Sequence, residues 1–210
     1  FMTAIAKQKL ALGTVMTIPG PKMYFQGDDN ADLSNFKFFR EFSGEKQQRE
    51  KDPDFANRIV LEKGYDTLES IARPDCILGR IKPEGMFKNL TTQMEEYYKD
   101  LSDLLQNMPV LKTGCIVGTY KDTNHNVHIH HLKLGNDEVL VIKNFGQGFH
   151  NKTYVYNDFP QNSDWQEVFN SDAKKYGGSG YVNQNKDTIT NKNQQLFLAP
   201  NSIIILKKVK

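Results

Sequence analysis

The sequence predicts two regions of different fold class: an α/β segment over residues 1–112 and an antiparallel β-sandwich over residues 113–210. Helical hydrophobic periodicity marks the first region. From residue 113 onward, short runs of β-branched and aromatic residues are separated by turns rich in Gly, Asn and Asp. Several short strands at this spacing are typical of a sandwich.

The first region opens with a helix expected over residues 3–17, whose Lys7 and Lys9 are expected to face solvent. The run Pro19-Gly20-Pro21 ends this helix. Residues 22–26 then form a short aromatic strand of the buried type. A helix, a tight turn and a buried strand make up one αβ step of a parallel sheet.

A long irregular stretch over residues 28–92 contains a charged run and a cluster of phenylalanines between Phe36 and Phe42. A segment of this length within a compact domain is usually functional or an insertion. A clearly amphipathic helix follows over residues 93–107, and Pro109 is expected to end it.

The second region is expected to contain short strands separated by turns such as Gly135-Asn136-Asp137. The expected strands cover residues 115–120, 127–134, 139–143, 152–156, 166–169, 195–198 and 202–209.

Composition argues against several functional classes. A net charge of +2 and a pI near 8.4 give no strong field for nucleic acid or an anionic membrane. No apolar run approaches the roughly 18 residues of a spanning helix, and no secretory signal is evident. The two cysteines, Cys76 and Cys115, favour a reduced pair. We expect an intracellular, cytoplasmic protein, with an organelle as the open alternative, and the Phe1 start suggests a processed product or a fragment.

The most informative stretch runs from Trp165 to Asp172 and continues with Tyr176-Gly177-Gly178-Ser179-Gly180. Consecutive glycines permit positive φ, so a loop can fold tightly against a sheet. The single tryptophan has the size of a core anchor. We interpret these residues as a structural motif rather than as ligand contacts. Its members are Trp165, Asn170, Asp172, Tyr176, Gly177, Gly178 and Gly180.

These residues resemble the signature of the C-terminal β-domain of the α-amylase superfamily, glycoside hydrolase family 13, in the form found in 1,4-α-glucan branching enzymes. Residues 11–29 resemble helix 7, strand 8 and the following loop of the family's (β/α)8 barrel, and residues 93–113 resemble helix 8 and its exit. The resemblance implies the last helix-strand-helix of a barrel over residues 1–112, followed by the C-terminal β-sandwich domain. The sequence departs from the family at Asp29, where Glu is usual.

Glycosyl transfer of this class needs two carboxyl groups flanking the scissile bond. The resemblance places these groups on barrel strands 4 and 5, upstream of Phe1, so no catalytic residue is expected in this chain. Asp28 and Asp29 follow the expected strand 8 and are candidates for the cleft rim, with a turn or cap as the alternative. Phe38 and Phe39 are candidates for stacking on sugar rings, with apolar packing as the alternative.

A group of histidines at positions 125, 128, 130 and 131 raises the question of a metal site. His128 and His130 share one face of an expected strand, a spacing that zinc uses. No second cysteine or carboxylate cluster lies nearby in the sequence, so we expect a half-exposed strand face, with no metal and no cofactor.

Two functional hypotheses follow. The resemblance implies the C-terminal part of an α-glucan-acting, branching-enzyme-like protein that is not catalytic by itself. The alternative is a degenerate, non-catalytic relative that serves as a structural subunit of a larger assembly. Either way, we expect the remaining barrel segment or other subunits as partners, with α-glucan as a candidate ligand. The partner would cover apolar residues otherwise left exposed, namely Leu10, Leu12, Val15, Met16, Met23 and Phe25.

Overall fold

The protein divides into two compact units in the computed structural model, Phe1–Tyr24 with Gln93–Lys210 and Phe25–Thr92. The first unit joins the opening helix to the β-region and therefore crosses the boundary expected at residue 112. The structure describes residues 2–23, 86–146, 154–155, 163–181, 183 and 195–209.

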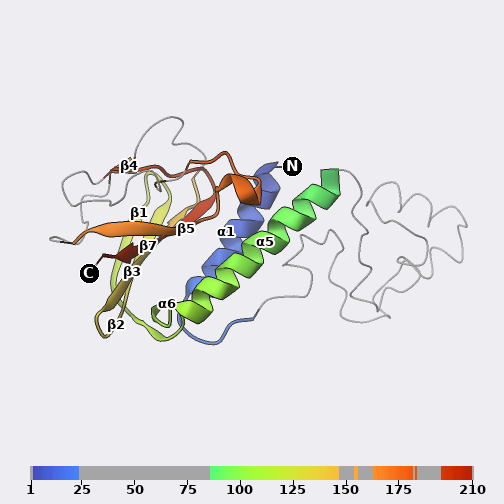
Figure 1. Cartoon of the computed structure of the whole chain (residues 1–210). Coiled ribbons are helices and arrows are strands. Elements are labelled where there is room, and N and C mark those ends of the chain that lie inside the picture. Colours follow the sequence, from blue (N-terminus) through green and yellow to red (C-terminus); the bar gives the residue numbers. More distant parts are fainter. Residues whose placement is uncertain are drawn as a thin grey trace, which may run out of the picture. The chain divides into compact units, whose positions relative to one another are not determined.

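Five antiparallel strands form the main sheet, in the order β1-β2-β3-β7-β5 (Figure 1). They are β1 (Cys115–Asp122), β2 (Val127–Leu134), β3 (Asp137–Asn144), β5 (Trp165–Asn170) and β7 (Ser202–Lys208). A second sheet pairs β4 (Tyr154–Val155) with β6 (Gln195–Leu196), which is shorter than expected. The antiparallel β-sandwich expected for this region is confirmed.

The two central strands β3 and β7 are buried on both faces. Their register places Leu140 opposite Leu206 and Ile142 opposite Ile204. Because successive side chains point to opposite faces, these four line one face of the sheet. On that face the four side chains belong to one hydrophobic core with residues of the small sheet and of β5, including Tyr154, Trp165 and Leu196.

The opposite face of β3 and β7 is covered by helix α1 (Met2–Thr17), beside which α5 (Met86–Asn107) lies (Figure 1). Gly13 marks the point where these elements meet. A Cβ atom there would lie 2.5 Å from the Tyr97 hydroxyl on α5 and 2.9 Å from Cγ2 of Ile203 on β7. Only a residue without a side chain lets the helix approach this closely.

This packing corrects two expectations about α1. The side chains of Leu10, Leu12 and Met16 are buried rather than exposed, and α1 packs on β7 and β3 of the protein's own sheet. Lys9 is also buried, with 4% of its surface exposed, whereas it was expected to face solvent.

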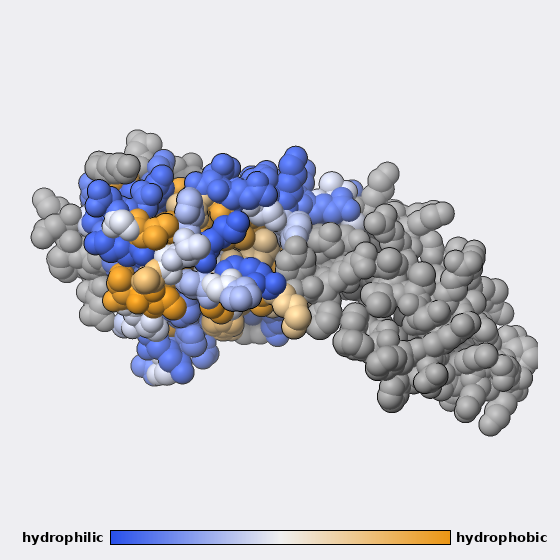
Figure 2. Space-filling view, turned by 90° about the horizontal axis from the view of Figure 1, so that it is seen from below, coloured by the Kyte–Doolittle hydropathy of each residue, from blue (hydrophilic) through white to orange (hydrophobic). Residues whose placement is uncertain are grey.

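Some apolar surface does stay exposed in the described part of the chain. Val15 is 39% exposed and Met23 is 80% exposed. Figure 2 shows patches of hydrophobic residues among hydrophilic ones on one face of the molecule. Lys22 and Met23 do not form the start of a strand, and Phe25 lies outside the described residues.

The second helix differs in its limits from the sequence prediction. It begins at Met86 rather than at residue 93 and ends at Asn107. A short helix that was not expected, α6 (Val110–Thr113), follows directly after Pro109. Proline fits this place because it lacks only an N–H that a helix start leaves unpaired. None of the helices in the described ranges is both long and apolar enough to cross a membrane.

Candidate functional site

Asp172, just after β5, organises the loop over residues 172–181, which we call the motif loop. Its carboxylate accepts hydrogen bonds from the Ser179 N–H at 3.0 Å, the Ser179 hydroxyl at 2.9 Å and the Tyr181 N–H at 3.0 Å. Its carbonyl oxygen accepts another from the Gly180 N–H at 2.9 Å. A single aspartate thereby closes the loop upon itself.

The glycines of the motif each meet a separate steric demand. Gly177, which follows the 3-10 helix η2 (Lys174–Tyr176), has φ +71°, and Gly180 has φ +85°, both in the left-handed region that favours glycine. Gly178 lies against the start of the loop, where an added Cβ would be 2.1 Å from the Asp172 carbonyl oxygen. The loop therefore requires glycine at all these positions.

A buried polar network holds the other side of the loop. Oε2 of Glu167 accepts hydrogen bonds from Nδ2 of Asn170 at 3.1 Å and from the N–H and Nδ2 of Asn183 at 3.1 and 2.7 Å. Its Oε1 is buried without a hydrogen-bond partner among the described residues. Burial raises the pKa of Glu167, and the hydrogen bonds from Asn183 and Asn170 offset this only in part.

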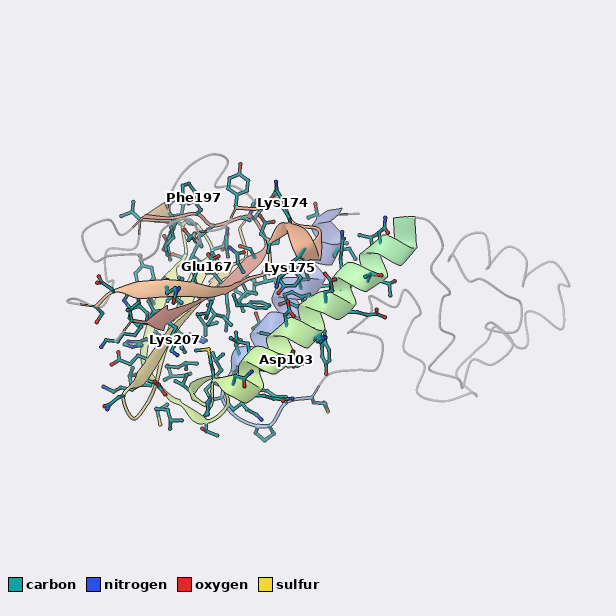
Figure 3. The ribbon with its side chains drawn as sticks, in the orientation of Figure 1. Asp103, Glu167, Lys174, Lys175, Phe197 and Lys207 are labelled. Atoms are coloured by element: carbon teal, nitrogen blue, oxygen red, sulfur yellow. The ribbon has the colours of Figure 1, made fainter. Side chains whose placement is uncertain are left out.

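The loop is attached to α5 through Tyr176. Its hydroxyl donates to Asp100 at 2.7 Å, and Nζ of Lys175 contacts the same carboxylate oxygen at 2.5 Å. Figure 3 shows Lys175 beside α5. The Tyr176 ring packs edge-on against Tyr97, with 5.4 Å between centroids, and Tyr97 is also 5.4 Å from Phe169 of β5. These contacts join the helix, the loop and the sheet.

Lys9 makes the corresponding attachment from α1. Its Nζ donates to the carbonyl oxygens of Ser171 and Tyr176, both at 2.9 Å. Its own carbonyl oxygen accepts a hydrogen bond from the Tyr97 hydroxyl at 2.6 Å. Burial lowers the pKa of Lys9 to about 8, and the nearby charge of Asp172 opposes this shift.

The arrangement is suited to holding elements together rather than to chemistry. Trp165 is fully buried in the sandwich core, and Asn170, Asp172 and Tyr176 direct their polar atoms to groups of the same chain. The other candidates named from sequence, Asp28, Asp29, Phe38 and Phe39, lie outside the described residues and stay predictions.

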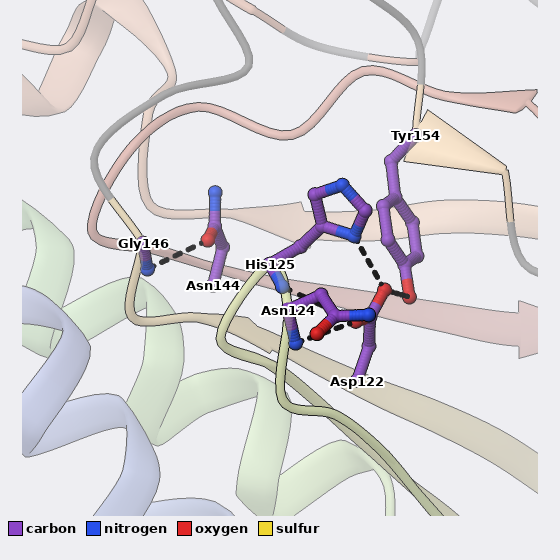
Figure 4. Close-up of polar contacts among 6 residues, drawn as sticks. All are labelled: Asp122, Asn124, His125, Asn144, Gly146 and Tyr154. Carbon is purple, nitrogen blue, oxygen red and sulfur yellow. Dashed lines mark hydrogen bonds and ion pairs between the residues drawn. The ribbon is translucent and has the colours of Figure 1, made fainter.

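The histidines do not assemble a metal site in the described part of the chain, which contains no group of three metal-binding side chains. His125 instead lies 2.8 Å from a carboxylate oxygen of Asp122, to which Tyr154 also donates at 3.3 Å (Figure 4). Asp122 thereby links the turn between β1 and β2 to β4 of the small sheet.

The sequence interpretation missed Lys9, Tyr97, Asp100 and Asn183 as partners of the motif. A signal existed for Lys9, because residues 5, 9, 12 and 16 form a single helical stripe that is otherwise apolar. The sequence contained no such signal for Asp100, because it lies 76 residues from Tyr176 along the chain.

Comparison with known proteins agrees with this architecture. Residues 118–209 match the family model described as alpha amylase, C-terminal all-beta domain. This part of the chain is therefore similar to that family, and we call it the α-amylase C-terminal domain. The resemblance to the C-terminal portion of α-amylase-superfamily proteins is confirmed.

Curated relatives of this α-amylase C-terminal domain include two bacterial enzymes. The 1,4-alpha-glucan branching enzyme GlgB of Protochlamydia amoebophila is 32% identical over 93 residues, which are 42% of this chain and 12% of that enzyme. The corresponding enzyme of Trichodesmium erythraeum is 34% identical over 98 residues, 43% of this chain and 12% of the enzyme. The matched region thus spans a small part of these relatives.

Solved structures share the fold over nearly the whole chain. The isomaltulose synthase SmuA from Protaminobacter rubrum aligns with a TM-score of 0.53 at 17% identity, covering 98% of this chain and 38% of the synthase. An α-amylase from Geobacillus thermoleovorans aligns with a TM-score of 0.56 at 13% identity, covering 98% of this chain and 34% of the amylase.

Gly178→Ala should destabilise the α-amylase C-terminal domain by about 2–4 kcal/mol, because the added methyl group collides with backbone that cannot move without opening the loop. Chemical denaturation followed by Trp165 fluorescence measures this loss. Gly118→Ala is the matched control, because its Cβ would meet only the side chain of His131, no closer than an ordinary 3.5 Å. Equal losses in the two variants would show that the loop has no special need for glycine.

The two buried lysines should make stability depend on pH. Burial lowers the pKa values of Lys9 and Lys143 from 10.5 to about 8. Between these values the unfolded chain binds more protons than the folded protein, so the free energy of unfolding should rise with pH. Lys9→Met should flatten this rise by up to about 1.4 kcal/mol per pH unit.

The measurement is chemical denaturation at pH values from 8 to just below 10, the range between the folded pKa of Lys9 and the ordinary pKa of tyrosine. Above pH 10 the buried tyrosines have the opposite influence on stability, because burial raises their pKa values. The unfolded chain then loses the tyrosine protons first, so the free energy of unfolding falls with pH. The control is Lys7→Met, because Lys7 is exposed on the same helix. A slope that stays unchanged in Lys9→Met would contradict the assignment.

Proposed function

We propose that this chain is the structural C-terminal part of an α-glucan-acting, branching-enzyme-like protein and performs no glycosyl transfer by itself. In this proposal the α-amylase C-terminal domain holds the last helices of a (β/α)8 barrel in place. The chemistry resides on barrel segments supplied elsewhere. The observation that carries the proposal is the attachment of α1 and α5 to the motif loop through Lys9, Tyr97 and Asp100.

Hydrogen bonds and ion pairs within the chain already engage several carboxylates, which supports a domain without catalysis. Retaining and inverting glycosidases both need two carboxyl groups facing a substrate across a gap. Three carboxyl groups of the domain contact N–H groups or cations of their own chain. They belong to Asp172, Glu167 and Glu138.

The outer face of α1 supports a barrel segment as the partner. Its exposed residues include Val15, at 39% exposure, and the small side chains of Ala4 and Ala11. Small and branched residues on one helix face permit close packing against another element of secondary structure. In this proposal the partner is either a further segment of the same protein or a separate subunit.

Incubation of the purified chain with amylose should leave both the iodine-staining spectrum and the number of reducing ends unchanged, because in this proposal both catalytic carboxyl groups lie on barrel segments supplied elsewhere. A branching enzyme assayed in parallel provides the positive control. Turnover that persists through purification and disappears in Glu167→Gln would overturn the proposal. The mass of the protein in its source cells separates a longer enzyme from a subunit near 24.1 kDa.

A further inference from the structure

A row of basic side chains crosses three strands at the end of the sheet farthest from α6. The register places Lys121 of β1 opposite His128 of β2, and His128 opposite Lys143 of β3. Directly opposed residues lie on the same face of a sheet. Like charges in such positions destabilise a sheet, so the row calls for a compensating group.

Lys143 is the most deeply buried member of this row. It is 2% exposed, and among the described residues its Nζ has one hydrogen-bond contact, to Nδ1 of His130 at 3.4 Å. Lys9, which is equally buried, donates to two carbonyl oxygens at 2.9 Å instead. A buried ammonium group normally has a counter-charge or a full set of acceptors.

The contact with Lys143 also determines the tautomer of His130. Nδ1 must be unprotonated to accept from the ammonium group, so the ring carries its proton on Nε2 and can donate from there. His130 and His128 are half-buried, and Lys121 is exposed. The row is therefore closed at Lys143 and open towards the β1 edge.

Within the described part of the chain, no acidic side chain forms an ion pair with a member of this row. Burial lowers the pKa values of His128 and His130, and the charge of Lys143 lowers both further. Lys121 also lowers the pKa of His128, and His128 lowers that of His130. The nearest acids in the sequence point elsewhere. Asp122 contacts His125 and Tyr154, and Glu138 contacts His131.

We propose that Lys121, His128, His130 and Lys143 form a binding site for a phosphate group, either as free phosphate or as a phosphate ester of a sugar. Ammonium and imidazole N–H donors side by side on one face of the sheet suit the several oxygens of such an anion. Phe145 borders the site: its ring packs against His128 with 5.3 Å between centroids, and it is 43% exposed. An exposed ring at this border can contact the sugar of an ester.

Isothermal titration calorimetry of the full chain with inorganic phosphate tests the site. Saturable binding is expected, and both Lys143→Met and His128→Leu should weaken it by about tenfold or more, because each removes a hydrogen-bond donor to the anion. His128 is half-buried, so its variant remains informative if Lys143→Met fails to fold. Lys133→Met is the control, because Lys133 lies on the opposite face near Glu138.

Glucose 6-phosphate distinguishes the two sources of the phosphate group. Tighter binding than inorganic phosphate, lost in Phe145→Ala, identifies a sugar phosphate, whereas equal or weaker binding identifies free phosphate. The proposal is overturned if neither compound binds saturably, or if binding is the same in the wild type, Lys143→Met and His128→Leu. The outcome does not depend on whether the chain acts with an α-glucan partner.

Discussion

Burial of the two central strands on both faces is the constraint on which the rest of this structure depends. The segment Ser202–Lys208 presents a continuous aliphatic run, so neither face of β7 tolerates water. The small sheet β4–β6 closes one face, and α1 closes the other. The helix that resembles part of a barrel is therefore also a layer of the C-terminal domain.

This arrangement explains why a lysine and several tyrosines are buried at the junction. Taking the ammonium group of Lys9 out of water is costly, but its two carbonyl partners lie at 2.9 Å and belong to Ser171, just before the motif loop, and to Tyr176 within it. The hydrogen bonds exist only when α1, the loop and α5 are all in register. The junction thus specifies one docking geometry, which apolar contacts alone do not select.

The strands were predictable because short runs of β-branched and aromatic residues between Gly, Asn and Asp turns carry a local signal. The motif glycines were likewise predictable as sites of tight backbone packing. Lys9 was placed wrongly because residue type was given more weight than its position in the helical stripe of residues 5, 12 and 16. The partners Asp100 and Asn183 could not be predicted, since only the fold brings them to Tyr176 and Glu167.

Gly13→Ala tests most directly whether the helices and the sheet form one cooperative unit. Alanine favours a helix over glycine by about 1 kcal/mol, but here its methyl group would displace the Tyr97 hydroxyl and Ile203. We predict that denaturation followed by Trp165 fluorescence and by far-UV circular dichroism shows coincident transitions, both moved to lower denaturant concentration. A stabilised protein, or a helical transition that separates from the fluorescence transition, would contradict this account.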